Sequence, residues 1–217
     1  MKKLFVTFTF LLIGLLVTQA QEPFFANKKG MILEYANKNA KGKISDGMRY
    51  TILETEVDGD NIIVAYQADL LDKKMKKINE NPIEVKLKII DGTIEFDPGS
   101  AFGKIMEGLE IKGTGLTLPS NLSAGQKLKD YQMSIKSLGV ESKATNVIVE
   151  SQEDITVEAG TFNAYKVTCD LNSKALFIKT QGKSSAWYVR GIGHVRTENY
   201  DKKGKLISYT ELINIEQ

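Results

Sequence analysis

Cysteine is almost absent from this sequence of 217 residues. The one cysteine, Cys169, has no partner for an internal disulfide. It also lies far from the N-terminal region, so we expect no diacylglyceryl-cysteine anchor of the kind that lipoproteins carry. The fold must then be stabilised by burial of hydrophobic side chains, which make up 42% of the chain.

Histidine is just as scarce, because His194 is the only one. A zinc or other transition-metal site needs several His or Cys ligands, and only Cys169 could join it. No Gly-x-Ser-x-Gly motif marks a serine nucleophile. Gly191 and Gly193 look like part of a phosphate-binding turn, but a strand and a hairpin follow them where such a site needs a helix. We expect no metal, no cofactor and no catalytic residue.

An excess of charge of either sign is also missing. The chain has 29 Lys and Arg residues against 27 Asp and Glu residues. Loss of Lys2 and Lys3 with a leader peptide would make the two numbers equal. Binding to nucleic acid or to anionic membranes is driven by excess positive charge, so the composition argues against both partners.

The only long apolar run is at the N-terminus. Two lysines precede an apolar stretch from Leu4 to Val17, which ends in the small-residue site Thr18 to Ala20. This is the pattern of a secretory signal peptide, and the stretch is shorter than the ~20 residues that a membrane-spanning helix needs. We predict a signal peptide at 1–20 and a single β-rich domain at 21–217. The protein should be periplasmic or secreted, without an integral membrane span.

Hydrophobic and polar residues alternate along most of the remaining chain, and this period of two is typical of half-buried strands. In the segment TFNAYKVTCDL, Tyr165, Val167, Cys169 and Leu171 fall on one face. The residues of NIIVAYQADL, from Asn61 to Leu70, alternate in the same way. Further strands are predicted at 31–35, 48–57, 83–90, 129–136, 145–150, 187–198 and 206–215.

Three turns of one pattern lie between these strands. They are Asn39 to Lys43 (NAKGK), Asp72 to Lys76 (DKKMK) and Asp201 to Lys205 (DKKGK). The leading Asn or Asp can accept hydrogen bonds from the turn backbone, and Gly in the fourth place supplies a positive φ. Met75 takes the Gly place in the middle copy, which should strain that hairpin or change its type. Short turns join sequential strands, so we predict an antiparallel meander.

One segment departs from the period of two. Phe102, Ile105, Met106 and Leu109 recur at helical spacing and predict one short amphipathic helix. The segment that follows, Lys112 to Gln126, is a long connection rich in Gly and Ser, and loops of this kind are often functional.

The number of strands sets the expected fold class. About ten strands exceed what a strongly twisted open sheet usually holds, so the sheet should curl. We therefore predict a mainly β fold, an antiparallel meander curled into a half-barrel or barrel with one short amphipathic helix. A β-sandwich is the alternative.

The only Trp and the only His occur together in the segment WYVRGIGHVRTENYDKKGKL. Its glycines, Gly191 and Gly193, favour a bulge or bend that lets the sheet curl. A four-residue hairpin loop would place His194 opposite Glu211, whereas a three-residue loop would put the two on opposite faces. The candidate polar cluster consists of His194, Arg190, Arg196 and Glu211.

Five motifs follow one another along most of the chain after the leader. They are LEYANKNAKGK, YQADLLDKKMKK, LPSNLSAGQKLKD, VEAGTFNAYKVT and WYVRGIGHVRTENYDKKGKLISYTEL. This order resembles the TapB-like exported proteins of Gram-negative bacteria, a group related to domains of unknown function. No catalytic residues are established for such families. The resemblance implies association with a tetratricopeptide-repeat protein in the periplasm.

A curled sheet with one helix also resembles periplasmic lipoprotein carriers of the LolA and LppX kind, whose concave face holds acyl chains under a helical lid. By this analogy of fold we predict a non-enzymatic protein that binds a hydrophobic ligand such as a lipid. The candidate cavity residues are Tyr66, Tyr165, Val167, Trp187, Val189 and Tyr209 on strands, with Phe102, Ile105 and Met106 on the helix.

Three alternatives remain open at this point. The same side chains would suit a filled core equally well, because strand aromatics usually pack inside. The protein could instead be an interaction or envelope-assembly module, recognised through a sheet edge or through the loop at 112–126. A hydrolase that uses His194 is the third possibility.

Overall fold

The structure, a computed structural model, describes residues 22–59, 61–95, 110–175 and 178–217. The predicted signal peptide lies outside these residues. So does the predicted helix at Phe102 to Leu109, with its candidate cavity residues Phe102, Ile105 and Met106. Both therefore stay predictions.

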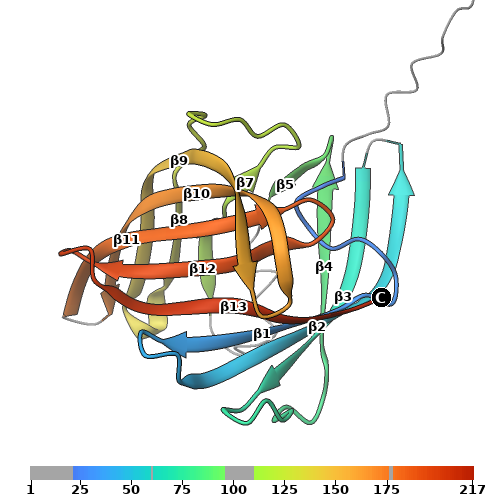
Figure 1. Cartoon of the computed structure of the whole chain (residues 1–217), viewed down its shortest axis with the longest axis horizontal. Coiled ribbons are helices and arrows are strands. Elements are labelled where there is room, and N and C mark those ends of the chain that lie inside the picture. The colour runs from blue at the N-terminus through green and yellow to red at the C-terminus, as the bar shows by residue number, and fades with distance from the viewer. Residues whose placement is uncertain (1–21, 60, 96–109, 176–177) are drawn as a thin grey trace, which may run out of the picture.

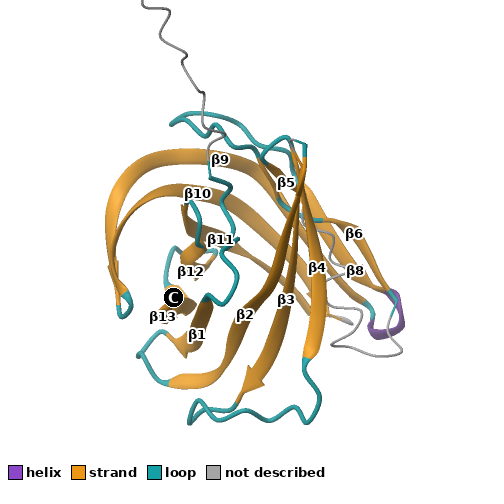
Figure 2. Ribbon diagram, turned by 90° about the vertical axis from the view of Figure 1, so that its right-hand side faces the viewer, coloured by secondary structure: helices purple, strands orange, loops and turns teal. Residues whose placement is uncertain are grey.

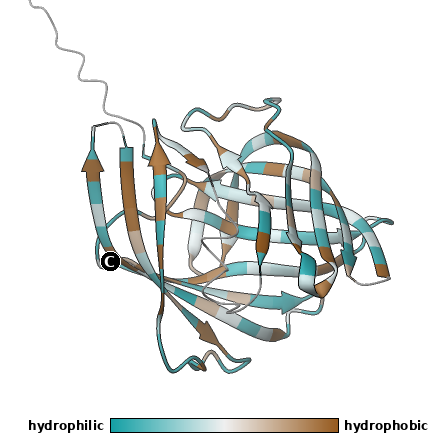
Figure 3. Cartoon of the chain, turned by 180° about the vertical axis from the view of Figure 1, so that it is seen from behind, coloured by the Kyte–Doolittle hydropathy of each residue, from teal (hydrophilic) through white to brown (hydrophobic). Residues whose placement is uncertain are grey.

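The described chain is almost entirely β, as predicted. Thirteen antiparallel strands form one sheet, and the only helical element within the described ranges is a single 3-10 turn, η1 (Lys136–Leu138). The strands are β1 (Ile32–Asn39), β2 (Ile44–Asp58), β3 (Asn61–Leu71), β4 (Ile83–Ile90), β5 (Thr93–Glu95), β6 (Ile111–Thr114), β7 (Thr117–Leu118), β8 (Tyr131–Ile135), β9 (Val140–Val157), β10 (Gly160–Ala175), β11 (Ile178–Val189), β12 (Gly193–Asp201) and β13 (Leu206–Glu216). Figure 3 shows polar and apolar residues alternating along these strands.

The sheet curls around one concave side (Figures 1 and 2). Its strand order is β6-β8-β9-β10-β11-β12-β13-β1-β2-β3-β4-β5-β7, so most neighbours are sequential and β13 pairs with β1. The end strands β6 and β7 do not pair with each other in the described sheet, although only Gly115 and Leu116 separate them along the chain. The predicted curled meander is confirmed, with thirteen strands rather than about ten and without closure. The sandwich alternative is wrong, because there is one continuous sheet.

A β-bulge in β12 decides which face of the sheet His194 occupies. Trp187 pairs with Arg196, whereas Tyr188 pairs with His194. Val195 is therefore an extra residue in β12, and it is fully buried. Trp187 and Tyr188 are consecutive and point to opposite faces, and each shares its face with its partner. His194 and Arg196 consequently lie on opposite faces of the sheet.

The three turns of repeated sequence share one geometry, as their pattern predicted. In each, the side-chain oxygen of the leading Asn39, Asp72 or Asp201 accepts two hydrogen bonds from backbone N–H groups two and four residues later, at 2.8 to 3.1 Å. These bonds fix the backbone of the tip without help from the core.

Met75 adopts the backbone conformation that glycine takes in the other two turns. Its φ is 60°, against 79° for Gly42 and 77° for Gly204. A left-handed conformation costs a residue with a Cβ roughly 1–2 kcal/mol. The Met75 side chain lies against Gly47, where an added Cβ would come within 2.6 Å of the Met75 methyl carbon. The hairpin therefore keeps the type of its two copies, and this packing offsets the predicted strain.

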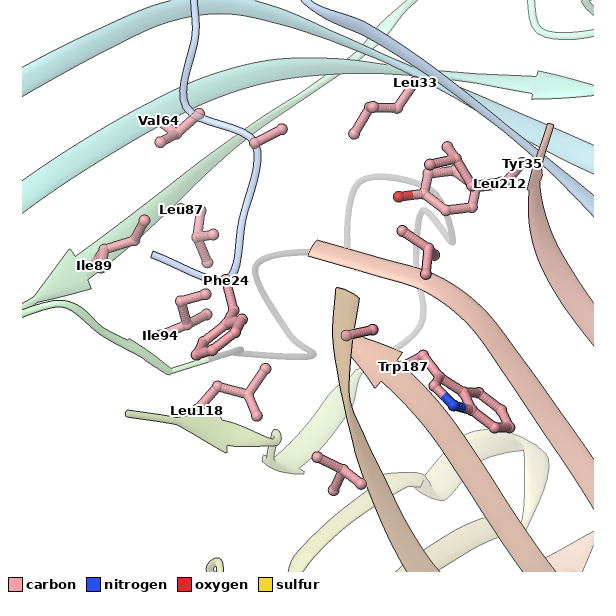
Figure 4. Packing of buried hydrophobic residues seen from close by; sticks show 14 of the residues in the cluster. Phe24, Leu33, Tyr35, Val64, Leu87, Ile89, Ile94, Leu118, Trp187 and Leu212 are labelled. Atoms are coloured by element: carbon pink, nitrogen blue, oxygen red, sulfur yellow. The ribbon is translucent and has the colours of Figure 1, made fainter. Parts of the chain in front are cut away.

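The first residues of the described chain pack inside the curl. Phe24 is 2% exposed and belongs to the main hydrophobic core (Figure 4). The carbonyl of Pro23 accepts a hydrogen bond from the Gly191 amide at 2.7 Å, which ties this segment to the turn between β11 and β12. Pro23, Phe24 and Ala26 are therefore buried, although no period of two marks this segment in the sequence.

Gly182 allows β11 and β12 to approach closely. A Cβ at this position would lie 2.0 Å from the carbonyl oxygen of Tyr200, which is backbone and cannot rotate away. We expect Gly182→Ala to lower the free energy of unfolding by about 1–3 kcal/mol, the range of overpacked sites. Urea unfolding followed by circular dichroism measures the change. The neighbouring exposed substitution Lys183→Ala should stay within about 0.5 kcal/mol of wild type, and equal losses in the two variants would contradict this account.

Candidate functional site

The concave side of the sheet holds a cavity of about 400 Å³. Its walls come from strands all around the curl and from residues 24–26. The aromatic lining residues are Phe24, Phe25, Tyr35, Tyr50, Tyr66, Tyr131, Tyr188 and His194, and the larger aliphatic ones are Leu33, Ile52, Ile94, Leu116, Leu118, Met133 and Ile192. None of the described residues that line it carries an Asp, Glu, Lys or Arg side chain. The cavity is therefore apolar, with hydroxyl groups and one imidazole as its main polar groups.

Four of the predicted cavity residues lie at or near this space. Tyr66 lines it directly. Tyr165 lies one layer behind, with its ring 5.5 Å from that of the lining residue Phe24. Val167 belongs to the surrounding core cluster and Val189 packs against it, and neither is among the described lining residues. Of these four side chains, Tyr66 therefore faces the cavity, and the other three pack in or against the core around it.

Trp187 and Tyr209, also predicted for the cavity, have their contacts on the other face of the sheet. The Trp187 indole N–H donates to the Glu153 carboxylate at 2.8 Å. The Tyr209 ring lies under the Arg196 guanidinium, 4.4 Å from its centroid. Trp187 and Arg196 are paired, so they share the face opposite to Tyr188. Neither Trp187 nor Tyr209 is among the described lining residues of the cavity.

The predicted polar cluster is divided among three places. Arg196 and Glu211 do come together, paired across β12 and β13 with 3.6 Å between Nη1 and Oε1. Arg190 instead donates to the backbone carbonyl of Glu22 at 3.0 Å. His194 lines the cavity on the opposite face. The closing hairpin has a three-residue loop, since the Asp201 N–H donates to the Lys205 carbonyl, and His194 and Glu211 lie on opposite faces as that alternative predicted. The bulge in β12 takes part in this result, because it separates the face of His194 from that of Arg196.

Glu211 is a buried carboxylate that holds the β9–β10 hairpin in place. Lys38 donates to it at 3.0 Å, and the Glu158 amide at the hairpin tip donates at 3.2 Å. The next amide, that of Ala159, donates to the Leu212 carbonyl at 3.2 Å. Figure 1 shows this hairpin crossing over β11 and β12 toward β13. Glu211 and Arg196, which the sequence placed in a candidate site with His194, therefore belong to a structural clamp on the outer face, formed by Glu211 with Lys38 and the Glu158 amide.

Lys38→Met should weaken this clamp measurably. The Lys38 and Glu211 side chains are only 12% and 10% exposed. Burial acts to lower the pKa of Lys38, but hydrogen bonds to Glu211 and Glu158 raise it overall. Removing this cation leaves the Glu211 carboxylate with the Glu158 amide and the more distant Arg196, so we expect a loss of roughly 2–3 kcal/mol in the free energy of unfolding. Denaturant titration measures it. Glu158→Gln, at a side chain 61% exposed, should change stability by less than about 0.5 kcal/mol.

His194 lies among tyrosines at the cavity wall. Its ring stacks on Tyr35 with centroids 4.6 Å apart, and Tyr188 lies edge-on at 6.5 Å. Burial lowers the pKa of His194 to about 4. His194 is half-buried and lines the cavity. At neutral pH His194 is therefore an uncharged group with one N–H donor and one acceptor nitrogen.

The tyrosines continue from His194 as a connected aromatic row. Tyr35 and Tyr50 are 5.6 Å apart, Tyr50 and Tyr66 are 5.5 Å apart, and Phe25 lies 5.5 Å from Tyr66. Burial raises the pKa of Tyr66 to about 12 and raises the pKa of Tyr35 and Tyr50 further. All three hydroxyls are therefore protonated and uncharged at any physiological pH.

No group of three or more His, Cys, Asp or Glu side chains that could hold a metal ion occurs among the residues that the structure describes. In the same residues, no helix has the length and hydropathy required to cross a membrane.

Comparison with known proteins gives one family and two structures. A family model described as DUF3108-like matches residues 28–212. A crystal structure from Bacteroides fragilis NCTC 9343, described as a candidate exported protein with a YmcC-like fold, has a TM-score of 0.75 and 21% identity, and the match covers 90% of this chain and 100% of that one. A candidate lipoprotein from Parabacteroides distasonis ATCC 8503 has a TM-score of 0.74 and 22% identity, with coverages of 91% and 100%. No curated protein matches. At these identities the likeness establishes the fold alone.

Proposed function

This chain belongs to the DUF3108-like family, and we propose that it is an exported, non-enzymatic protein that binds a hydrophobic small molecule, such as a lipid, in the cavity described above. The observation that carries the proposal is the cavity itself. It offers about 400 Å³ on the concave side of the sheet, and its described lining is aromatic and aliphatic without a charged side chain.

The size and lining of the cavity suit a small apolar ligand. Small-molecule pockets typically measure about 300–1,000 Å³ and are mostly apolar, with a few polar groups that orient the ligand. Water gains little in such a space, because it needs two to four polar partners. Burial of apolar ligand surface contributes roughly 25 cal/mol per Å². A volume of about 400 Å³ fits one small apolar molecule or one lipid chain better than a lipid with several chains.

Export is part of the same proposal. The two N-terminal lysines, the apolar run from Leu4 to Val17 and the small residues that follow have the pattern of a signal peptide. The two structures of the same fold are described as a candidate exported protein and a candidate lipoprotein, which supports this location. Cleavage near Ala20 would leave Phe24, Phe25 and Ala26 to pack at the cavity wall.

The fluorescent and uncharged probe N-phenyl-1-naphthylamine tests the proposal. Its emission rises in apolar surroundings, so we expect a saturable increase at about one probe per protein, as expected for a single small-molecule pocket. The protein is purified, its bound material is removed with organic solvent, and the protein is then refolded before the titration. The absence of a saturable signal in refolded protein with native circular dichroism would contradict binding in the cavity.

An envelope-assembly module is a second candidate function, and one observation favours it. β6 is an end strand of the sheet, and its residues Lys112, Gly113 and Thr114 are exposed. An end strand offers unpaired backbone groups to which another protein can add a strand. A tetratricopeptide-repeat partner, which the sequence resemblance implies, would belong to this function. Lys112→Pro should abolish capture of such a partner, because it disrupts the backbone of the end strand, and should leave probe binding unchanged.

The geometry gives the hydrolase hypothesis no support. The contacts of His194 are stacking and edge contacts with Tyr35 and Tyr188 and a backbone carbonyl that accepts from Tyr35. No hydroxyl or thiol within the described ranges is hydrogen-bonded to its ring. Ser142 lines the same cavity, but its hydroxyl bonds to that of Ser173 at 3.0 Å. A serine nucleophile needs a direct bond to its base.

A further inference from the structure

We propose that the ligand is an uncharged apolar molecule that carries a hydrogen-bond acceptor, such as an ester or ketone oxygen, and that the hydroxyls of Tyr50, Tyr66 and Tyr188 with His194 receive this oxygen. The inference rests on the proposed binding function and specifies the chemical class of the ligand.

The described wall of the cavity carries no charged side chain. The described lining contains no basic side chain that could pair with a carboxylate or phosphate, and no acidic one that could pair with an amine. An ion that leaves water for an apolar site without an opposite charge loses its hydration, and hydroxyl groups replace that hydration only in part. His194 does not supply a positive charge, since it is uncharged at neutral pH. The wall therefore selects against both anionic and cationic ligands.

Three of the tyrosine hydroxyls at the cavity have no hydrogen-bond partner among the described residues. The Tyr35 hydroxyl donates to the His194 carbonyl at 2.9 Å, and that of Tyr131 lies 4.0 Å from the Cys169 sulfur. For Tyr50, Tyr66 and Tyr188, the structure contains no hydrogen bond from the hydroxyl to any described residue. Tyrosine hydroxyls inside a protein normally have a partner, so these three, unpaired among the described residues, can bond a molecule in the cavity.

The same hydroxyls are open to the cavity rather than sealed in the core. The fully buried side-chain atoms that lack a partner in the described chain are the amide oxygens of Asn27 and Asn61, and no tyrosine hydroxyl is among them. Tyr50, Tyr66 and Tyr188 also line the cavity. A hydroxyl that is accessible, lines the cavity and is unpaired is available to a bound molecule.

The position of these groups explains why an acceptor is favoured. Tyr50 and Tyr66 are in edge contact at 5.5 Å, and Tyr188 approaches His194 from a different strand at 6.5 Å. Each tyrosine hydroxyl can donate, and the neutral imidazole adds one further N–H. Tyr35 links the two groups, because its ring lies 5.6 Å from Tyr50 and stacks at 4.6 Å on His194. The rings that carry these donors are therefore contiguous along the cavity wall, and a carbonyl oxygen with two lone pairs can accept from two donors.

Displacement of N-phenyl-1-naphthylamine by four ligands with the same alkyl chain tests the inference. The ligands are methyl dodecanoate, dodecanoate, dodecyltrimethylammonium and dodecane, compared at about pH 8, where the carboxylate is ionised. We expect methyl dodecanoate to displace the probe at a concentration at least about tenfold lower than either ion. This ratio corresponds to about 1.4 kcal/mol. Dodecane should be intermediate, because it fits the space but accepts no hydrogen bond.

The outcomes separate this inference from the proposed function. Binding of the probe and dodecane together with equal displacement by ester and dodecanoate would overturn the inference and leave the binding function in place. Equal displacement by ester and dodecane would overturn the role of the acceptor. Failure of the probe and of all four ligands to bind would overturn the proposed function.

Removal of the hydroxyls provides the matched variants. The combined substitution of Tyr50→Phe, Tyr66→Phe and Tyr188→Phe should weaken methyl dodecanoate about tenfold and leave dodecane within about twofold, the scale of one or two hydrogen bonds. Tyr200→Phe is the control, because its hydroxyl bonds to Glu198 and is not among the described groups of the cavity. An equal loss for ester and alkane would show that the variant has damaged the cavity in general, and the donor role would then be rejected. The single Tyr66→Phe variant serves if the triple variant fails to fold.

Discussion

Leu33→Trp should weaken the binding of N-phenyl-1-naphthylamine by at least about tenfold relative to the wild type. This change corresponds to a loss of about 1.4 kcal/mol or more in binding free energy. Leu33 is 3% exposed, belongs to the core cluster and lines the cavity from β1. The larger indole would occupy space that the ligand needs. Because the space is open, the substitution should leave the free energy of unfolding unchanged or raise it, since filling a cavity restores lost contacts.

Two further variants make this result decisive. Ile207→Trp adds the same side chain at a residue 54% exposed on β13 and should bind the probe as the wild type does. Ile52→Phe adds less volume at another lining residue and serves if Leu33→Trp is overpacked and destabilised. Wild-type affinity in a well-folded Leu33→Trp protein would mean that the probe binds elsewhere.

Acid should destabilise the protein through His194, by about 3 kcal/mol between neutral pH and about pH 4. Burial lowers the pKa of His194 from 6.5 to about 4. Below pH 6.5 the unfolded state therefore takes up a proton that the folded state refuses, and the stability present above pH 6.5 is lost as the pH falls toward 4. A pKa unit corresponds to about 1.4 kcal/mol, so the two and a half units give roughly 3 kcal/mol.

The comparison with His194→Gln isolates this contribution. Carboxylates also titrate in acid, since hydrogen bonds from Trp187 and Ser151 hold the pKa of Glu153 below its usual value. These groups are unchanged in the variant, so the difference between the two proteins reports His194 alone. Urea titrations from about pH 7 to pH 4 should show the wild type losing about 3 kcal/mol more than the variant. Parallel pH profiles would mean that His194 has the same pKa in the folded and unfolded states, which would contradict the lowered pKa.

Alternation along the chain was sufficient to predict the fold class, because one face of a curled sheet is buried and the other is wet. The segment from Asn61 to Leu70 shows this alternation directly, and it forms β3 in the structure. The turn pattern led by Asn39, Asp72 and Asp201 was equally readable, since it acts through local hydrogen bonds. The predicted relation to domains of unknown function is confirmed by the family match, while the TapB-like name stays a prediction.

The cavity was harder to predict, because bulges shift the period of two. Val195 in β12 turns His194 inward and Arg196 outward. The glycines that favoured a bulge in this segment, Gly191 and Gly193, lie in the β11–β12 turn and at the start of β12 instead of at the extra residue. Tyr66 was found because its strand alternates without interruption up to that point. Trp187 was chosen over Tyr188 although Tyr188 faces the cavity. A strand that contains a bulge needs its neighbours before its faces can be assigned.

The tyrosines of β1 and β2 illustrate a signal that was present but unused. Met31, Leu33 and Tyr35 alternate on one face of a predicted strand, and Tyr50 follows in the next one. Their pairing is what builds the aromatic row, and pairing depends on contacts between distant strands. The N-terminal segment with Phe24 could not be placed from sequence at all, since it packs as an irregular segment whose only guide is the surface that it covers.

The most direct test of the central claim is gentle-ionisation mass spectrometry of the protein purified from its own host, beside Leu33→Trp prepared in the same way. We predict that the wild type carries one small adduct that is released by organic solvent, identified as an uncharged apolar molecule, and missing from Leu33→Trp. A bare wild-type mass, in a protein that also fails to bind N-phenyl-1-naphthylamine, would contradict the account.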